Sequence, residues 1–467
     1  MPCSAYASKE MLRRLAVVAA VGALSAVPGS ARGGPDDALA KLLARTNAVA
    51  REVSKLRGLP LKHMIPYDVV DKDELRARLI AQASDAKSKA EVAAEALALG
   101  RWGMIPPAVD LAALVLDLLT EQVAGYYDPD TKKLTVSKSA VDDPAWAEMV
   151  QAHEIDHGLQ DQSFDLKKYE DVPDTEGDAQ LARRAVVEGD GIAVMIEVTL
   201  ARQKIAVDWS APDAAAMIEK DMGTPAGAGP AGVGSAGVGG DQFDRAPLAV
   251  RESMIFPYRA GFGFVAALRH HNPWSAVDVA FTKPPRSTEQ IIHPERYLAG
   301  DEPVPVQVSV PAALRGWTFG VSTVWGELGF DLFLRAHGVD LSVAAEAAAG
   351  WGGDRMVVMV KSGDPSPEHA IGLARMEWDS EADAIEAAEA ATRAMDHATA
   401  GATVDHAETR TRWLALDGTV SWVERRGPSL VLVRGAPASL AEALATDVWT
   451  STGPAAPPTT RIRPPKR

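Results

Sequence analysis

The segment MVQAHEIDHGLQDQSFDL constrains this chain more than any other stretch. It places His153 and His157 four positions apart, with Glu154 directly after the first histidine. Asp143 and Pro144 just upstream are typical of an N-cap and a first helical position, so the pattern predicts a helix through this segment. Because residues four apart lie on one helix face, the two imidazoles can bind a single metal ion.

The glutamate between the histidines fits the same chemistry. Glu154 lies beside the histidine face, where a carboxylate can take a proton from a water at the metal without binding the metal itself. The alternative is a solvated helix with incidental histidines. The chain has only 10 histidines, and a chance HExxH is expected about one time in a hundred in a protein of this size. The metal-binding interpretation is therefore favoured.

A catalytic zinc site normally has three protein ligands and one open position for water. A third histidine in the extended HExxHxxGxxH pattern would need glycine at position 160 and histidine at position 163. The chain has Gln160 and Ser163 there, which closes that solution. The remaining common solution is a glutamate from a following helix.

A second helix, predicted over residues 178–203, carries the candidate. At 100° per residue, Glu188 lies within an apolar stripe, where a carboxylate is costly unless it is paired or coordinated. Gly189 and Gly191 beside it permit close approach of another backbone. We therefore expect Glu188 to be the third ligand, and the alternative is an ion pair with Arg184 at i−4 spacing.

Composition limits the class of protein. A chain of 467 residues is expected to fold as two or three units. The net charge of −15 argues against nucleic-acid binding. No stretch approaches the roughly 20 apolar residues of a membrane-spanning helix, so no span is expected in the mature chain.

The N-terminal residues resemble an export signal. A basic start at Arg13 and Arg14 precedes an apolar run and small residues, which predicts a signal peptide over residues 1–31 and a secreted or periplasmic protein. The alternative is a buried N-terminal helix. Cys3, the single cysteine, would be removed with the signal, so any metal must be held by His, Asp and Glu.

The pattern along the chain predicts an α+β protein. Residues 121–139 show two β-prone runs around a turn and predict a hairpin, whose strand KLTVSK could be the edge along which an extended peptide binds. The predicted organisation is a signal peptide at 1–31, an N-terminal helical segment at 36–100, a mainly helical core with a small sheet at 101–222, a Gly/Ala/Pro-rich flexible loop at 223–241, completion of the core at 242–315, a C-terminal α+β domain at 316–449 and a disordered tail at 450–467.

Four blocks, EQVAGYYDPDTKKLTV, AHEIDHGLQDQSFDL, AVVEGDGIAVM and PPRSTEQIIHPERYLAG, together resemble a family of secreted, largely uncharacterised bacterial proteins with a gluzincin-like zinc metallopeptidase core. The resemblance spans roughly residues 100 to 300. It implies a zincin-like fold in which His153, His157 and Glu188 bind Zn²⁺ and Glu154 is the general base.

Further residues are candidates for supporting roles. Asp156 stands before the second histidine, where such enzymes usually have an uncharged residue. If Asp156 orients a histidine the site is retained, and the alternative is that it binds elsewhere, which would argue against activity. A metallopeptidase also needs a donor to the tetrahedral oxyanion. The candidates are Tyr127, Arg286, His293 and Tyr297, and the alternative for each is a structural role.

The sequence thus predicts a secreted zinc peptidase that acts on a peptide or protein substrate. A glutamate general base would activate water at the metal and then pass the proton to the leaving amine. The alternative is a non-catalytic binding protein that keeps the peptidase scaffold, with or without structural zinc.

Overall fold

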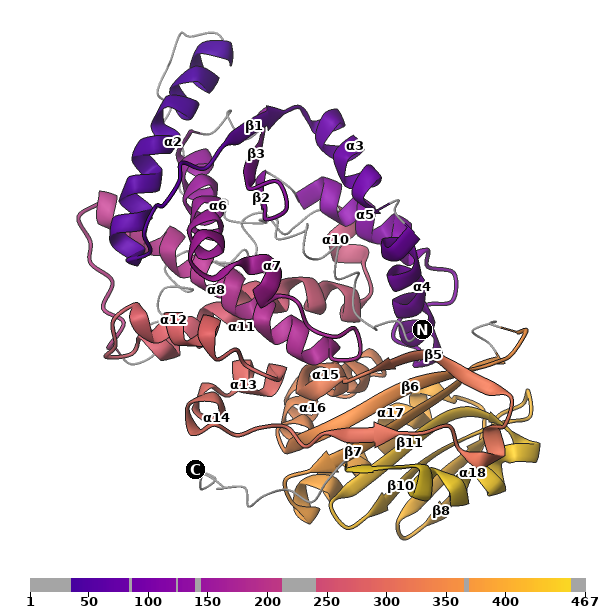
Figure 1. Ribbon diagram of the computed structural model, residues 1–467. Helices are drawn as coiled ribbons and strands as arrows, with labels where there is room; N and C mark the ends of the chain where they lie inside the picture. The colour runs from indigo at the N-terminus through magenta and orange to yellow at the C-terminus, as the bar shows by residue number, and fades with distance from the viewer. Residues whose placement is uncertain are drawn as a thin grey trace.

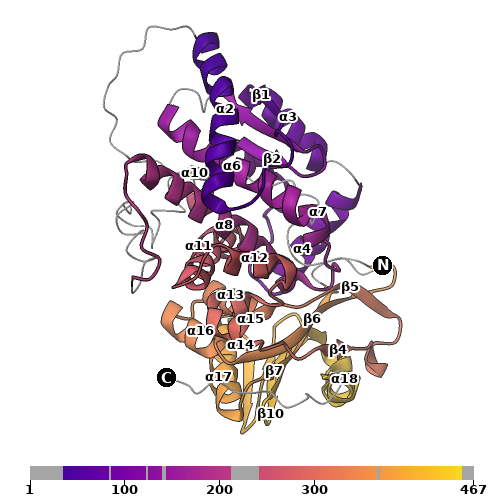
Figure 2. The same cartoon turned by 60° about the vertical axis from the view of Figure 1, so that its left-hand side comes forward.

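The computed structural model describes residues 35–83, 86–122, 125–138, 144–211, 241–364 and 369–454. Two units differ in secondary structure (Figures 1 and 2). The first, in indigo to pink, is mostly helical and carries a three-stranded sheet; the second, in orange to yellow, is built on a seven-stranded sheet. This mixture of helix and sheet agrees with the predicted α+β class.

The helices of the first unit account for most of its residues. They are α2 (Pro35–Arg57), α3 (Lys72–Ala83), α4 (Ala86–Arg101), α5 (Leu111–Gln122), α6 (Pro144–Phe164), α7 (Leu166–Tyr169), α8 (Gly177–Arg202), α10 (Asp241–Arg245), α11 (Leu248–Arg269), α12 (Ser275–Thr282), α13 (Thr288–Ile292) and α14 (Pro294–Ala299). The predicted helices through HEIDH and over residues 178–203 correspond to α6 and α8. Pro144 begins α6 as expected, while Asp143 lies outside the described residues.

The small sheet corrects one expectation. The predicted hairpin exists, with β2 (Gly125–Asp128) antiparallel to β3 (Lys133–Ser137). A third strand, β1 (Tyr67–Val70), pairs with β3 in parallel, so the order is β1-β3-β2. The KLTVSK strand is therefore central, and it cannot serve as a peptide-binding edge. The covering strand, YDVV, is four residues long and too short to be recognised by its pattern.

Helices α6, α8 and α11 form the centre of the first unit. The backbones of α8 and α11 touch: a Cβ on Gly189 would lie 2.1 Å from the carbonyl carbon of Gly261, and a Cβ on Gly261 would lie 2.0 Å from the backbone oxygen of Ala185. Both positions therefore require glycine. The expectation that Gly189 permits close approach of another backbone is confirmed.

The N-terminal segment packs on α6. Val49 and Val53 of α2, together with Ile65, belong to an apolar cluster with Ile155 and Leu159 of α6. These α6 residues lie at the i, i+4 spacing of one helix face. The predicted N-terminal helical segment is thus part of the body of the first unit.

The second unit is a sheet with helices on both faces. Its strands are β5 (Trp317–Thr323), β6 (Trp351–Lys361), β7 (Ile371–Trp378), β8 (Thr403–Ala407), β9 (Arg410–Leu414), β10 (Thr419–Arg426) and β11 (Ser429–Pro437), in the order β5-β6-β7-β11-β10-β9-β8. Each described pair of neighbours is antiparallel. This sheet and the helices on it agree with the α+β domain predicted at 316–449.

Alternate residues of these strands serve two apolar clusters, as a period of two requires. Met356 and Val358 pack with α15 (Gly326–Ala336), α16 (Leu341–Ala348) and α17 (Glu381–Ala398). Val357 and Met359 instead pack with η2 (Ala312–Leu314) and α18 (Ala438–Ser451). The first cluster continues into α8 and α11, so the two units share one core.

Two predicted boundaries shift. Residues 450–454, assigned to a disordered tail, end α18 and form β12 (Thr452–Pro454), which pairs with β4 (Val306–Val308). This pairing also makes residues 306–315 part of the second unit. The predicted signal peptide, residues 223–240 of the predicted loop and residues 455–467 lie outside the described residues.

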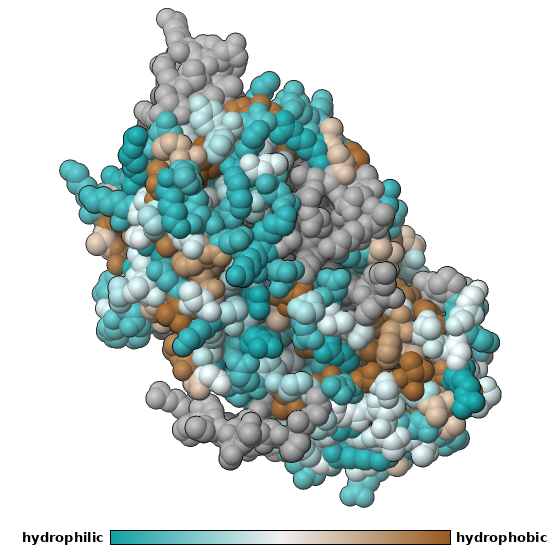
Figure 3. Space-filling model, viewed as in Figure 1, coloured by the Kyte–Doolittle hydropathy of each residue, from teal (hydrophilic) through white to brown (hydrophobic). Residues whose placement is uncertain are grey.

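Hydrophilic side chains cover much of the first unit on the face seen in Figure 1, and hydrophobic ones gather over part of the second unit (Figure 3). Within the described ranges, no helix combines the length and hydropathy needed to cross a bilayer.

Candidate metal centre

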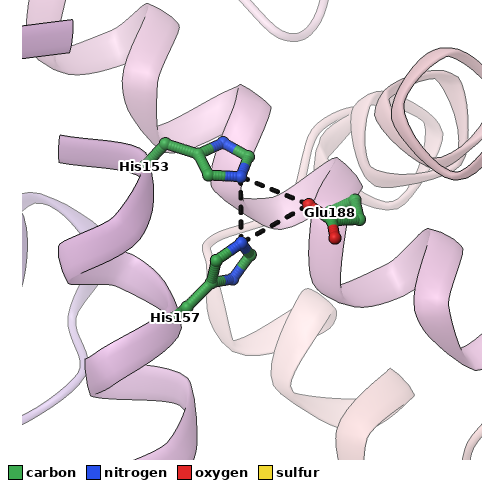
Figure 4. Close-up of side chains that lie close together, drawn as sticks. All are labelled: His153, His157 and Glu188. Atoms are coloured by element: carbon green, nitrogen blue, oxygen red, sulfur yellow. Dashed lines mark hydrogen bonds and ion pairs between the residues drawn. The ribbon is translucent and has the colours of Figure 1, made fainter. Parts of the chain in front are cut away.

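The two histidines of α6 and the glutamate of α8 meet between these helices (Figure 4). The Nε2 atoms of His153 and His157 are 2.9 Å apart. Glu188 Oε2 lies 3.2 Å from the first and 3.4 Å from the second. One ligand atom from each residue falls within 4.8 Å of the others, and this is the one such His/Cys/Asp/Glu group that the described residues contain. The sequence therefore predicted the three residues that come together.

A glycine of α8 makes room for one of the imidazoles. A Cβ on Gly191 would lie 2.7 Å from Cε1 of His153 and 2.8 Å from its Nδ1. Only a residue without a side chain lets the His153 ring lie against this helix. The two glycines beside Glu188 thus have different roles, because Gly189 contacts α11 and Gly191 contacts a candidate ligand.

Glu188 satisfies both interpretations of its sequence pattern. Its Oε2 faces the histidines, while Oε1 lies 3.4 Å from an Nη atom of Arg184, one turn earlier on α8. The ion pair at i−4 spacing and the contact with the histidines therefore coexist. Arg184 also offsets part of the cost of burying this carboxylate.

The three residues are buried, and they shift one another's pKa values. His153, His157 and Glu188 are 0%, 1% and 0% exposed. Burial and the neighbouring His157 lower the pKa of His153. Burial would also lower the pKa of His157, but the hydrogen bond and charge of Glu188 outweigh it and raise that pKa to about 10. Burial would raise the pKa of Glu188, yet its hydrogen bonds with both histidines hold that pKa well below its usual range.

These pKa shifts mean that the metal-free centre holds one extra proton, carried by His157 between the neutral His153 and the ionised Glu188. Two facing Nε2 atoms at 2.9 Å need either a proton or a cation between them, because two lone pairs at that distance repel. Two imidazole nitrogens and one carboxylate oxygen are the donor set of many catalytic zinc sites. The residues present therefore fit a divalent metal ion.

Glu154 lies next to the ligands but binds elsewhere. Its Oε2 accepts a hydrogen bond of 2.6 Å from the backbone N–H of Tyr127 on β2. Its Oε1 is buried and has no hydrogen-bond partner among the described residues. Burial, reinforced by the charge of Glu188, raises the pKa of Glu154 to about 8. A carboxyl group with one anchored and one free oxygen is suited to accept and release a proton.

Asp156 acts on a histidine through an intermediary. Its Oδ2 accepts a hydrogen bond of 2.8 Å from Nε2 of Gln160, and Oε1 of Gln160 lies 3.0 Å from Nδ1 of His157. The residue that touches the histidine is therefore Gln160. Of the two alternatives for Asp156, the contacts favour a supporting role, because the aspartate holds the glutamine that meets His157.

The predicted oxyanion donors are engaged elsewhere. The hydroxyl of Tyr127 donates to Asp161 at 2.7 Å, so this residue meets the site through its backbone N–H. Three candidates lie near α12–α15 and bind there. His293 contacts Glu327 at 2.9 Å, Tyr297 donates to the backbone oxygen of Lys283 at 2.9 Å, and the half-exposed Arg286 lies 3.9 Å from Glu302. The structure does not bring these three to the ligands.

Tyr258 of α11 was missed by the sequence reasoning. Its ring stacks on His153 with centroids 6.4 Å apart and planes at 27°, and its hydroxyl hydrogen-bonds with Glu188. Burial, followed by the charge of Glu188, raises the pKa of Tyr258 well above its usual value. The available signal was a tyrosine three residues before Gly261 in a mostly apolar helix, but it gave no indication of which side Tyr258 faces.

Comparison with known proteins finds a match only within the second unit. Residues 318–445 are similar to a family described as a domain of unknown function (DUF8575). The match runs from β5 into α18 and includes none of the residues around the metal centre. No curated protein and no solved structure matches the chain.

Proposed function

We propose that this protein is a zinc-dependent peptidase with a zincin-like core. The observation that carries the proposal is the buried group of His153, His157 and Glu188, with Glu154 beside it holding an unpartnered oxygen. Three protein ligands leave one coordination position open, which distinguishes catalytic zinc sites from structural ones with four ligands. When bound, Zn²⁺ would supply Lewis acidity that makes water nucleophilic near neutral pH and polarises a carbonyl.

The chain's own residues supply the proton transfers. Oε1 of Glu154 would accept the proton of the attacking water and deliver it to the nitrogen of the scissile amide. The N–H of Tyr127 holds Oε2 and so fixes the direction of the free oxygen. The hydroxyl of Tyr258 hydrogen-bonds with Glu188 and therefore lies beside the ligands. Once Glu188 binds the metal, this hydroxyl would be available to donate to a substrate oxygen.

Two variants test this proposal. Glu154→Gln keeps the shape and the acceptor oxygen but removes the basic carboxylate, so zinc content should stay near that of the wild type while hydrolysis of a peptide library falls at least ~100-fold. Glu188→Ala removes a ligand and should lower bound zinc. Zinc would be measured by elemental analysis, and hydrolysis with and without a chelator. Full metal and full activity in Glu188→Ala would contradict the ligand assignment.

Burial favours one second candidate. All four residues of the centre are 0–1% exposed, so a substrate must displace covering side chains to reach it. The same burial suits a non-catalytic protein in which zinc only stabilises the fold. One zinc per chain without cleavage of any library peptide would favour that candidate. Secretion through residues 1–31 stays a prediction.

A further inference from the structure

A chain of side chains runs from the second histidine to the N-terminal helix. Nδ1 of His157 lies 3.0 Å from Oε1 of Gln160, whose Nε2 lies 3.1 Å from Oδ2 of Asp190 on α8. The other oxygen of Asp190 accepts a hydrogen bond of 2.8 Å from Nε of Arg57, the last residue of α2. The carboxylate of Asp190 thus joins Arg57 to Gln160, although these two residues are 103 positions apart in the sequence.

The neighbours of Gln160 fix its amide orientation. Its Nε2 is within 3.2 Å of three oxygens, from Asp156, Asp190 and the backbone of Val187. These can serve as acceptors, so the amino end of the amide must face them. The carbonyl end then faces His157 and can only accept, which requires a hydrogen on Nδ1. A proton on Nδ1 leaves Nε2 to bind the metal.

Arg57 supplies the charge that this arrangement needs. Its side chain is 0% exposed, as is that of Asp190. Its Nη2 also lies 2.8 Å from the 35% exposed Asp278, and its guanidinium lies 4.6 Å from the ring of Trp274. Two buried aspartates beside one amide would repel each other without this cation. Arg57 therefore stabilises the acceptors that hold the amino end of Gln160.

We propose that Arg57 is a positioning residue that acts through Asp190 and Gln160 to hold His157 with Nε2 directed at the metal. This inference rests on the proposed zinc site. It makes α2 a component of the centre, so the N-terminal helix is required for metal binding. A guanidinium suits the position because its planar fork reaches two carboxylates at once.

Substitutions along the chain of contacts test the proposal in the full-length protein. Arg57→Met and Gln160→Leu should each weaken zinc binding about 10- to 100-fold, the range for residues that support a metal ligand. The double variant should be no weaker than the weaker single one, because both changes interrupt the same path. Asp278→Asn is the matched control: it removes the other partner of Arg57, which leads away from His157, and should leave zinc affinity within about twofold.

Zinc affinity would be measured by chelator competition. Imidazole ¹⁵N chemical shifts of the metal-free protein would report the hydrogen bond from Nδ1 of His157 to Gln160, which a general loss of packing does not alter specifically. Arg57→Met should change that signal. If Arg57→Met does not fold, Arg57→Lys replaces it, since lysine keeps the charge but loses the fork, and it should give a smaller change of the same kind.

Two results would overturn the inference: a folded Arg57 variant with wild-type zinc affinity and an unchanged His157 signal, or additive losses in the double variant. Failure of the proposed function is separate. If the wild-type protein binds no zinc, the zinc proposal fails, while the spectra of the metal-free variants still decide whether Arg57 orients His157.

Discussion

Alanine at Gly191 is a test of the metal centre that leaves every proposed ligand in place. The new Cβ would lie 2.7, 2.8 and 3.1 Å from Cε1, Nδ1 and Nε2 of His153, whereas ordinary contact begins near 3.4 Å. The ring must therefore recede by about 0.7 Å, several times the ~0.2 Å tolerance of a metal–ligand distance. Helix α8 cannot recede instead, because Gly189 on its other side already touches the backbone of Gly261.

Two free-energy terms oppose each other in the folding of Gly191→Ala. Alanine in a helix interior is favoured over glycine by about 1 kcal/mol. Overpacking a tight site costs about 1–3 kcal/mol. The net loss of stability should thus be at most ~2 kcal/mol, and the protein should fold. Zinc affinity should nevertheless fall about 10- to 100-fold, because a ligand ring has moved.

The assay pairs zinc titration by chelator competition with denaturant unfolding of the metal-free protein. Gly263→Ala on α11 is the control, since a Cβ there meets nothing within 4 Å. It should raise stability by up to ~1 kcal/mol and leave zinc affinity unchanged. Wild-type zinc affinity in a folded Gly191→Ala protein would refute the assignment of His153 as a ligand in this geometry.

Two further substitutions have effects whose direction follows from the structure. Tyr258→Phe keeps the ring on His153 and removes only the hydroxyl, so kcat for peptide hydrolysis should fall about 10²- to 10³-fold with zinc retained; equal kcat would exclude this donor. Glu95 is buried on α4, and burial raises its pKa to about 8. Its folded pKa exceeds its unfolded one, so its contribution to stability is complete below about pH 4.5 and is lost as pH rises toward 8. At about 1.4 kcal/mol per pH unit, the loss has an upper limit on the order of 5 kcal/mol. Glu95→Gln should flatten this decline in denaturant unfolding measured from pH 5 to 8; an unchanged slope would contradict the assignment.

Local periodicity was sufficient to predict the three candidate ligands. His153 and His157 are related by one helical turn, and a helix start with proline was visible just upstream. Glu188 was visible as a carboxylate within an apolar stripe, a placement that requires a partner. In each case the signal lies within about ten residues of the chain, which is the range over which helical periodicity carries information.

The supporting residues could not be predicted in the same way. Arg57 meets Asp190 across 133 positions, and Tyr258 reaches His153 from a helix that follows it by about a hundred residues. Nothing in the neighbourhood of either residue indicates which distant helix it contacts. The oxyanion candidates failed for this reason: residues such as His293 were chosen by chemical type, and their positions depend on how α13 and α14 pack.

The second unit, which carries the match to a domain of unknown function, also bears on the metal centre. The N-terminal end of α8 is held by β5 of this unit and by the neighbouring helix α13. Gly177 donates its N–H to Thr323 Oγ1 of β5 at 3.2 Å, and Asp178 accepts a 2.6 Å hydrogen bond from Thr288. Asp178 precedes Glu188 by ten residues of continuous helix, a distance of about 15 Å. An anchored helix start fixes both the axial position and the rotation of α8, and these two quantities determine where the carboxylate of Glu188 meets the histidines. Because the apolar core is also continuous between the units, the sheet unit is part of the frame that builds the centre and is not a tethered appendage.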